Sequence, residues 1–296
     1  QYNTATAAFN GNTLAFIAAA GNQILNAGLY GGVIMSGVFG MLIAMAAFNY
    51  LYNARSVSMM CTLPVKREGV FLSVFTSGLA AMLAINLIVF LRTLGVDASF
   101  GILALGNGYM LKWLVMVCMM NLFFFGFAAL CASFTGHIFV LPIVYIVLNF
   151  TVYVVEMLTR TIMSMFIYGI SSSDSSALAA LSPLVKMLMN RNIAETLEDP
   201  TNYSSAVIGY SYGGWASLAI YAVVGLVFAV LAMIIIKHRR METAGDVVSV
   251  KPLKPIFKYC LSVGCALVFG LLIFTTAFNN PTAIYGVRAM LFMLLF

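Results

Sequence analysis

Charged side chains are scarce in this chain, at 8% of 296 residues against 62% hydrophobic ones, and the mean hydropathy is +1.02. The chain is long enough for one bundle of membrane-spanning helices, but no soluble domain of typical size fits between its apolar runs. An energy-converting globular domain would therefore have to belong to another chain.

Catalytic and metal-binding motifs are also missing. The sequence contains no Walker A loop, Rossmann glycine fingerprint, HExxH or GxSxG motif. His137 and His238 have no Cys, Asp or Glu at ligand spacing, and Glu156 is the only acid inside a predicted span. We therefore predict no catalytic residue, no metal site and no enzyme activity. The cysteines form no CxxC or Cys/His set and are interpreted as small apolar residues: Cys61, Cys118, Cys131, Cys260 and Cys265.

The chain has instead a series of long apolar runs separated by short polar segments. A spanning helix needs about 20 apolar residues to cross about 30 Å of hydrocarbon. We predict an all-α polytopic bundle with at least six full spans plus a partial one. The expected spans are 29–52, 69–92, 110–133, 137–157, 214–237 and 257–278, followed by 285–296.

The chain begins at Gln1 and stops within an apolar run, so we expect a single transmembrane domain, 1–296, truncated at both ends, with a further helix before Gln1. A long outer segment, 157–213, is expected to form a partly helical extracellular cap, with helical spacing around Pro183, although a simple connector is the alternative.

The distribution of basic residues predicts the orientation. Segments 53–68 and 237–258 carry nine basic residues against three acidic ones, whereas the remaining connections carry six of each. Because Lys and Arg stay preferentially in cytoplasmic loops, both basic segments are expected in the cytoplasm, near anionic membrane lipids. Their division between two short loops without interleaved aromatic residues argues against nucleic-acid binding.

Small and polar residues recur at helical spacing inside several runs. The first and second spans carry stripes that favour helix packing, with a substrate groove as the alternative. In the fourth span, one helix face is expected at a subunit interface or on the transport path. Asn49, Asn86 and Asn121 are interpreted as isolated amides that bond between helices rather than select a substrate. The stripes are Gly32, Ser36, Gly40, Ala44 and Ala47, then Ser73, Ser77, Ala81 and Ala84; the polar face is Tyr145, Asn149, Tyr153 and Glu156.

The first basic loop is the most specific sequence, FNYLYNARSVSMMCTLPVKREGVF, residues 48–71. It predicts a short helix along the membrane that ends before Pro64, whose ring cannot continue a helix but can begin the next one. Met59, Met60 and Leu63 would offer a partner an apolar contact. An ordinary basic loop that fixes the topology is the alternative.

At this loop the chain resembles membrane subunits of bacterial ABC transporters of the ABC-2 permease type. The matching residues are Tyr50, Leu51, Arg55, Ser56, Leu63, Pro64, Lys66, Arg67, Glu68 and Phe71. A second similarity lies in the later basic loop, at Glu242, Ala244, Gly245 and Asp246.

The resemblance implies two cytoplasmic ABC ATPase subunits, which would bind ATP and Mg, and a second permease subunit, identical or homologous. This chain would bind no cofactor, lie in the bacterial plasma membrane and export a hydrophobic or amphipathic compound such as an antibiotic or peptide, as multidrug exporters do. An ion-coupled secondary transporter and a membrane sensor or scaffold are the alternatives. The implied ATPase-coupling residues are Arg55, Ser56, Val57, Ser58, Met59, Met60, Leu63, Pro64, Lys66, Arg67 and Glu68, with Glu242, Gly245 and Asp246 in the second loop.

Overall fold

The computed structural model describes residues 13–62, 64, 66–99, 103–166, 181–189, 192–197, 207–239 and 262. Most of these residues are helical, and two short strands form a hairpin. The elements are α2 (Thr13–Ala47), a 3-10 turn (Asn49–Leu51), α3 (Ala54–Thr62), α4 (Arg67–Ser99), α5 (Leu103–Phe134), α6 (Val140–Phe166), α7 (Pro183–Met189), β1 (Ile193–Leu197), β2 (Val207–Tyr212) and α8 (Trp215–His238).

Five of these helices are long and apolar enough to cross a membrane, which indicates a membrane protein. The apolar segments of α4, α5, α6 and α8 correspond to predicted spans. The start of the first predicted span was wrong, because the helix begins at Thr13 rather than near residue 29. Small residues and amides between 13 and 28 resemble a polar loop in sequence, yet Leu25 and Gly28 are buried. Apart from residue 262, both later predicted spans, 257–278 and 285–296, lie outside the described residues.

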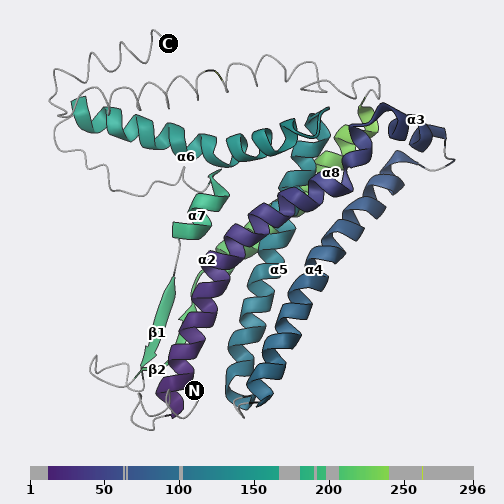
Figure 1. The fold of residues 1–296 in the computed structure, drawn as a ribbon. Helices are drawn as coiled ribbons and strands as arrows, with labels where there is room; N and C mark the ends of the chain where they lie inside the picture. Colours follow the sequence, from purple (N-terminus) through teal and green to yellow (C-terminus); the bar gives the residue numbers. More distant parts are fainter. Residues whose placement is uncertain are drawn as a thin grey trace.

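Helices α2, α4, α5 and α8 lie side by side, and α5 is the central one (Figure 1). In its apolar segment, 67% of residues are buried, against 39% or less in the other four. The last turns of α2, α5 and α8 and the first turn of α4 share one end of this bundle, where α3 also lies (Figure 1). We call this the basic end.

The interior is built around a run of phenylalanines in α5. The Phe75 and Phe125 ring centroids are 5.0 Å apart, and Phe123 contacts Tyr221 of α8 at 5.5 Å. Gly126 and Gly225 allow the α5 and α8 backbones to touch, since a Cβ on Gly225 would lie 2.5 Å from the Phe123 Cα. Close backbone approach at glycine is a common way for helices to associate where lipid removes the hydrophobic driving force.

Helix α6 runs across the bundle rather than along it (Figure 1). Pro142 lies in its first turn, where a missing backbone N–H costs little. Leu141, Val144 and Tyr145 are buried in its first half, whereas Val155 and Met157 are exposed in its second half. The bundle is therefore contacted mainly by the first half of α6.

The molecule is mostly helical, as the all-α prediction has it, but the segment between α6 and α8, expected to be partly helical, also contains two strands. Pro183–Met189 is helical as expected, but Ile193–Leu197 forms a strand that pairs antiparallel with Val207–Tyr212. The partner strand is rich in β-branched and aromatic residues, which favour strands. The hydrogen bonds from this partner strand stabilise the extended form of Ile193–Leu197 more than the helical spacing of its apolar residues favours a helix.

Candidate coupling site at the basic end of the bundle

The predicted short helix in the first basic loop is confirmed as α3. Asn53 caps it: the backbone N–H of Arg55 donates to the Asn53 side-chain oxygen at 3.2 Å. The helix ends at Thr62, and Pro64 follows. Val57 is 5% exposed and faces inward, whereas Met59 is 69% exposed. The helix thus has one face packed on the chain and an apolar side chain directed away from it.

The two helices that flank α3 are joined by stacked aromatic rings. Phe48 follows α2 directly, and its ring centroid lies 5.5 Å from that of Phe71 in the first turns of α4. Both side chains are buried. A displacement of α3 would therefore act on the ends of α2 and α4 together.

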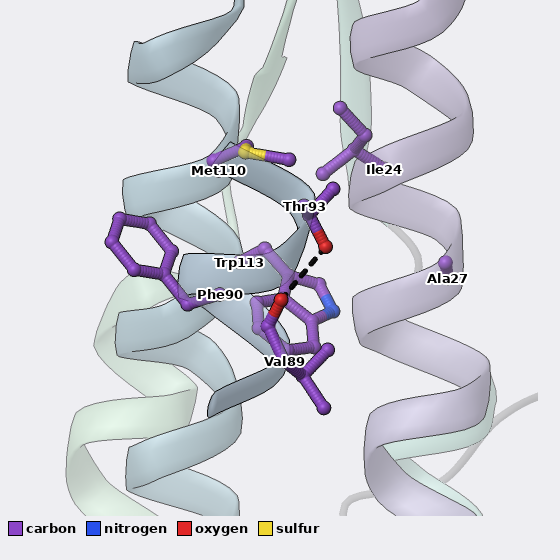
Figure 2. Close-up of a pocket in the computed structure, with 7 residues that line it drawn as sticks. All are labelled: Ile24, Ala27, Val89, Phe90, Thr93, Met110 and Trp113. Atoms are coloured by element: carbon purple, nitrogen blue, oxygen red, sulfur yellow. Dashed lines mark hydrogen bonds between the residues drawn. The ribbon is translucent and has the colours of Figure 1, made fainter. Parts of the chain in front are cut away.

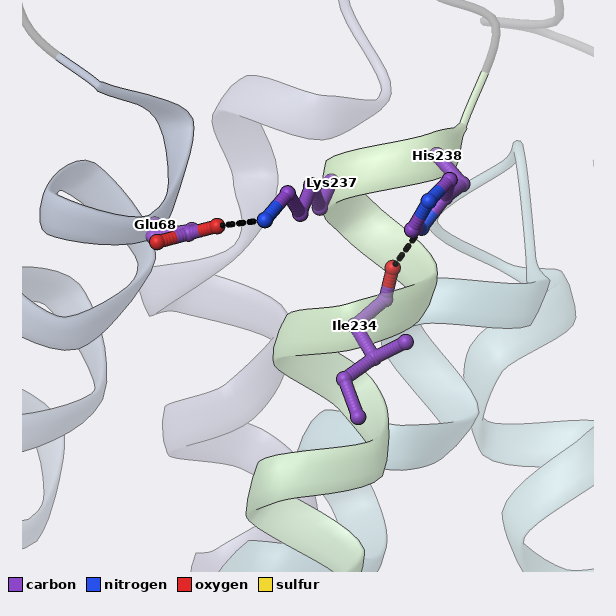
Figure 3. Close-up of polar contacts among 4 residues, drawn as sticks. All are labelled: Glu68, Ile234, Lys237 and His238. Carbon is purple, nitrogen blue, oxygen red and sulfur yellow. Dashed lines mark hydrogen bonds and ion pairs between the residues drawn. The ribbon is translucent and has the colours of Figure 1, made fainter.

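The start of α4 is also bound to the end of α8. Glu68 forms an ion pair with Lys237 at 2.5 Å (Figure 3), and a guanidinium nitrogen of Arg67 donates to the Arg239 carbonyl at 3.3 Å. Because the Glu68–Lys237 pair is exposed, it adds little stability. It does place the first residues of the second basic segment beside the end of the first one. The rest of the second segment lies outside the described residues.

Arg239 is the buried charge of this end and was not recognised in the sequence, where it was counted only as a loop charge. Its side chain donates to the carbonyls of Ala132 and Ser133, in the last turn of α5, at 3.4 Å each. A cation at a helix C-terminus satisfies otherwise unpaired carbonyls and complements the helix dipole. Its position three residues after Ile236, the last apolar residue of α8, was the only available signal.

Burial controls the ionisation of the groups around Arg239. The pKa of Tyr50 and of Tyr52 is raised to about 12, because burial disfavours the charged phenolate more than nearby Arg239 favours it. Burial lowers the pKa of Arg239 itself. The Tyr52 hydroxyl lies 3.2 Å from the Thr135 hydroxyl, which bonds it to the segment after α5.

Some predicted coupling residues are placed by the structure and others are not. Around α3, Ser56 is half-buried and Ser58 is exposed; beyond it, Pro64 and Lys66 are exposed. The Leu63 position and the Met60 side chain lie outside the described residues, as does the second-loop set of Glu242, Gly245 and Asp246. The assignment of these residues to an ATPase contact stays a prediction.

The polar face predicted in the fourth span is engaged within the chain over its first half. The Tyr145 hydroxyl donates to the Gly37 carbonyl of α2 at 3.1 Å, and the Ser182 hydroxyl donates to the Asn149 carbonyl. Glu156 pairs with Arg160 on the same helix at 3.1 Å. Tyr153 is half-buried. Whether this face also meets a transport path or another subunit stays a prediction.

The two small-residue stripes differ. On α2, a Cβ on Gly40 would lie 3.3 Å from the Phe125 backbone nitrogen, and Ser36 and Ala44 are buried, so this stripe packs on α5. On α4, the four residues of the stripe are exposed, and the hydroxyls of Ser73 and Ser77 bond to their own helix. Packing within the chain is thus confirmed for the first stripe and wrong for the second.

Comparisons with known proteins found no matching family model, no matching curated protein and no matching solved structure. Within the described residues, no group of three or more His, Cys, Asp or Glu side chains is arranged to hold a metal ion.

Proposed function

We propose that this chain is the membrane subunit of an ATP-driven exporter of the ABC-2 type, with a separate ATPase acting on α3. The observation that carries the proposal is α3 itself: a capped helix that connects α2 to α4 at the basic end and exposes Met59. The sequence similarity of this loop to ABC-2 permeases supports it. The exported compound would be hydrophobic or amphipathic.

Contacts around α3 support a route by which force reaches the bundle. The Phe48–Phe71 stack joins α2 to α4, Arg67 joins α4 to the end of α8, and Arg239 joins α8 to the end of α5. Helix ends connected in this way move together more readily than they move apart. Closure of a nucleotide-bound ATPase pair would then tilt several spans and switch access to the cavity between them.

Photochemical crosslinking tests the proposal. Met59 is replaced by photoreactive benzoylphenylalanine in the native host, and the captured protein is identified by mass spectrometry. We expect a cytoplasmic chain with a Walker A loop. The matched control carries the same amino acid at Ala98, an exposed residue at the other end of α4, and should not capture that chain.

The alternatives give different results. A secondary transporter would be purified without an ATPase and would be driven by a proton or sodium gradient. A sensor or scaffold would show neither ATPase capture nor transport. Equal capture of the ATPase from positions 59 and 98, or capture of no nucleotide-binding chain at position 59, would overturn the coupling proposal.

A further inference from the structure

Two cavities lie along the seam between α2 and α4, with α5 behind them. The larger has a volume of about 170 Å³ and lies toward the end of the bundle remote from α3; the smaller has a volume of about 40 Å³ and lies nearer its middle. Met35, Phe39 and Ile85 border the smaller cavity and are 56%, 45% and 49% exposed. Both cavities are therefore at the surface that faces lipid if these helices span a membrane.

The larger cavity is almost entirely apolar. Its lining comes from three helices and includes Ile24 of α2, Val89 of α4 and Trp113 of α5 (Figure 2). Its one hydroxyl, on Thr93, donates to the Val89 carbonyl at 2.8 Å and is therefore satisfied. A Cβ on Gly28 would lie 2.8 Å from the indole of Trp113, so the ring is packed against α2. An apolar cavity of about 150 Å³ is large enough to bind benzene.

The smaller cavity carries three polar side chains in an otherwise apolar lining. Ser36, Asn86 and Asn121 line it, one from each of the three helices. Ser36 is 2% exposed, and its hydroxyl has no hydrogen-bond partner among the described residues. The amides of Asn86 and Asn121 form no hydrogen bond with any described residue, so the expectation that they bond between helices was wrong. Unpaired polar groups in a lipid-facing bundle are costly and are usually explained by a ligand, water or function.

The two cavities are neighbours along the same seam. Ile85 and Val89 are four residues apart on α4, as are Val117 and Trp113 on α5, and each pair has one member in each cavity. Four residues of helix correspond to about 6 Å. A single small molecule can therefore reach both cavities.

We propose that this seam binds a neutral amphiphile from the bilayer. An aromatic or short branched apolar group fills the cavity at Trp113, while an amide, hydroxyl or carbonyl group bonds to Ser36, Asn86 and Asn121. No lining residue of either cavity is ionisable, so a charged group finds no partner there. The smaller volume suits one polar group, since a water occupies about 30 Å³ in the liquid. That this ligand is the cargo rests on the proposed export function; the binding site itself is tested on the chain alone.

Fluorescence of Trp113 gives a direct binding measurement. The chain has two tryptophans, and Trp215→Phe leaves Trp113 as the only one. The probe is 4-(4-bromophenyl)butanamide, whose bromine quenches tryptophan on contact, added to the purified variant in lipid bilayers. We expect saturable quenching. The matching carboxylate, 4-(4-bromophenyl)butanoate, should give no saturable quenching, because its charge would be buried without a partner.

Substitutions at each cavity separate the two parts of the site. Ala27 borders the larger cavity and is exposed, so Ala27→Phe should fill it and abolish saturable quenching. Ala80→Phe is the matched control, since nine residues place Ala80 on the opposite side of α4 from Val89. Ser36→Ala with Asn121→Leu should weaken binding of the butanamide probe about tenfold, because two hydrogen bonds to it are lost. Binding of 1-bromo-4-butylbenzene, which has no polar group, should be unchanged by that pair.

If the double variant at Ser36 and Asn121 fails to fold, Asn86→Leu removes a different polar group of the same cavity, at a half-buried position. Non-saturable quenching by the amide in the parent, equal quenching in Ala27→Phe and Ala80→Phe, or amide affinity unchanged by the polar substitutions would each overturn the proposal. None of these results bears on the α3 crosslink, so failure of the site and failure of the coupling proposal are distinguishable.

Discussion

Single glycines determine how closely α5 and α8 approach each other. A Cβ on Gly225 would lie 2.5 Å from the Phe123 Cα and 2.7 Å from the Leu122 carbonyl oxygen, both backbone atoms that cannot rotate away. We expect Gly225→Ala to destabilise the chain by about 1–3 kcal/mol, the usual cost of overpacking. Thermal unfolding in detergent measures it.

Gly31→Ala on α2 is the control, since nothing lies within 4 Å of its added Cβ. This variant should be unchanged or more stable by about 0.5–1 kcal/mol, because alanine is the better helix former. Equal melting temperatures for the two variants would show that the backbones of α5 and α8 lie farther apart at Gly225 than in the structure.

The buried tyrosines near Arg239 give a pH dependence of defined sign. Burial raises the pKa of Tyr50 and Tyr52 from about 10 to about 12. A group with a higher pKa in the folded state contributes stability that is complete below pH 10 and is lost as the pH rises through 12. The melting temperature should therefore fall between pH 10 and 12. Tyr50→Phe with Tyr52→Phe should flatten that fall; parallel curves for parent and double variant would contradict the burial of these phenols.

At the scale of elements, the sequence predicted those helices whose ends and packing depend on residues close together in the chain. Pro64 predicted the end of α3, since ring geometry acts within a few residues. Asn53, whose side chain caps the start, was not recognised in the sequence. The small-residue stripe of α2 predicted close packing for the same reason. The strand at Ile193–Leu197 was missed because its partner determines it, and partner strands are not visible in local spacing.

Candidate site residues were missed for a similar reason. Arg239 has a role only because the last turn of α5 lies beside it, more than a hundred residues earlier in the chain. The smaller cavity needs one polar residue from each of α2, α4 and α5, and Ser36 was interpreted as part of a packing stripe. Sequence spacing assigns a residue to a helix face, but it does not show which faces meet.

One hydrogen bond between α6 and α2 adds to the apolar contacts that hold α6 on the bundle. The Tyr145 hydroxyl reaches the Gly37 carbonyl of α2, and both residues are buried. We expect Tyr145→Phe to cost about 1 kcal/mol and to increase hydrogen exchange in the first half of α6. Tyr153→Phe, at a half-buried position on the same helix, should leave exchange there unchanged. Equal exchange in both variants would show that apolar packing alone holds α6.

At the scale of the whole molecule, the two basic segments constrain each other. Lys237 pairs with Glu68, so a membrane crossed by α4 and α8 has both segments on the same side. The excess of basic residues predicts that this side is the cytoplasm. The opposite end of α4, at Ala98, would then face outward.

Cysteine labelling in intact cells tests this orientation. The five native cysteines are replaced, and Met59→Cys or Ala98→Cys is introduced at exposed positions of opposite ends. A membrane-impermeant maleimide should label position 98 in intact cells and position 59 only after permeabilisation. The reverse pattern would place α3 outside, where no ATP-driven partner acts, and would exclude the coupling proposal. It would leave the amphiphile site intact, because that site lies along the seam of α2, α4 and α5 and does not depend on which end faces the cytoplasm.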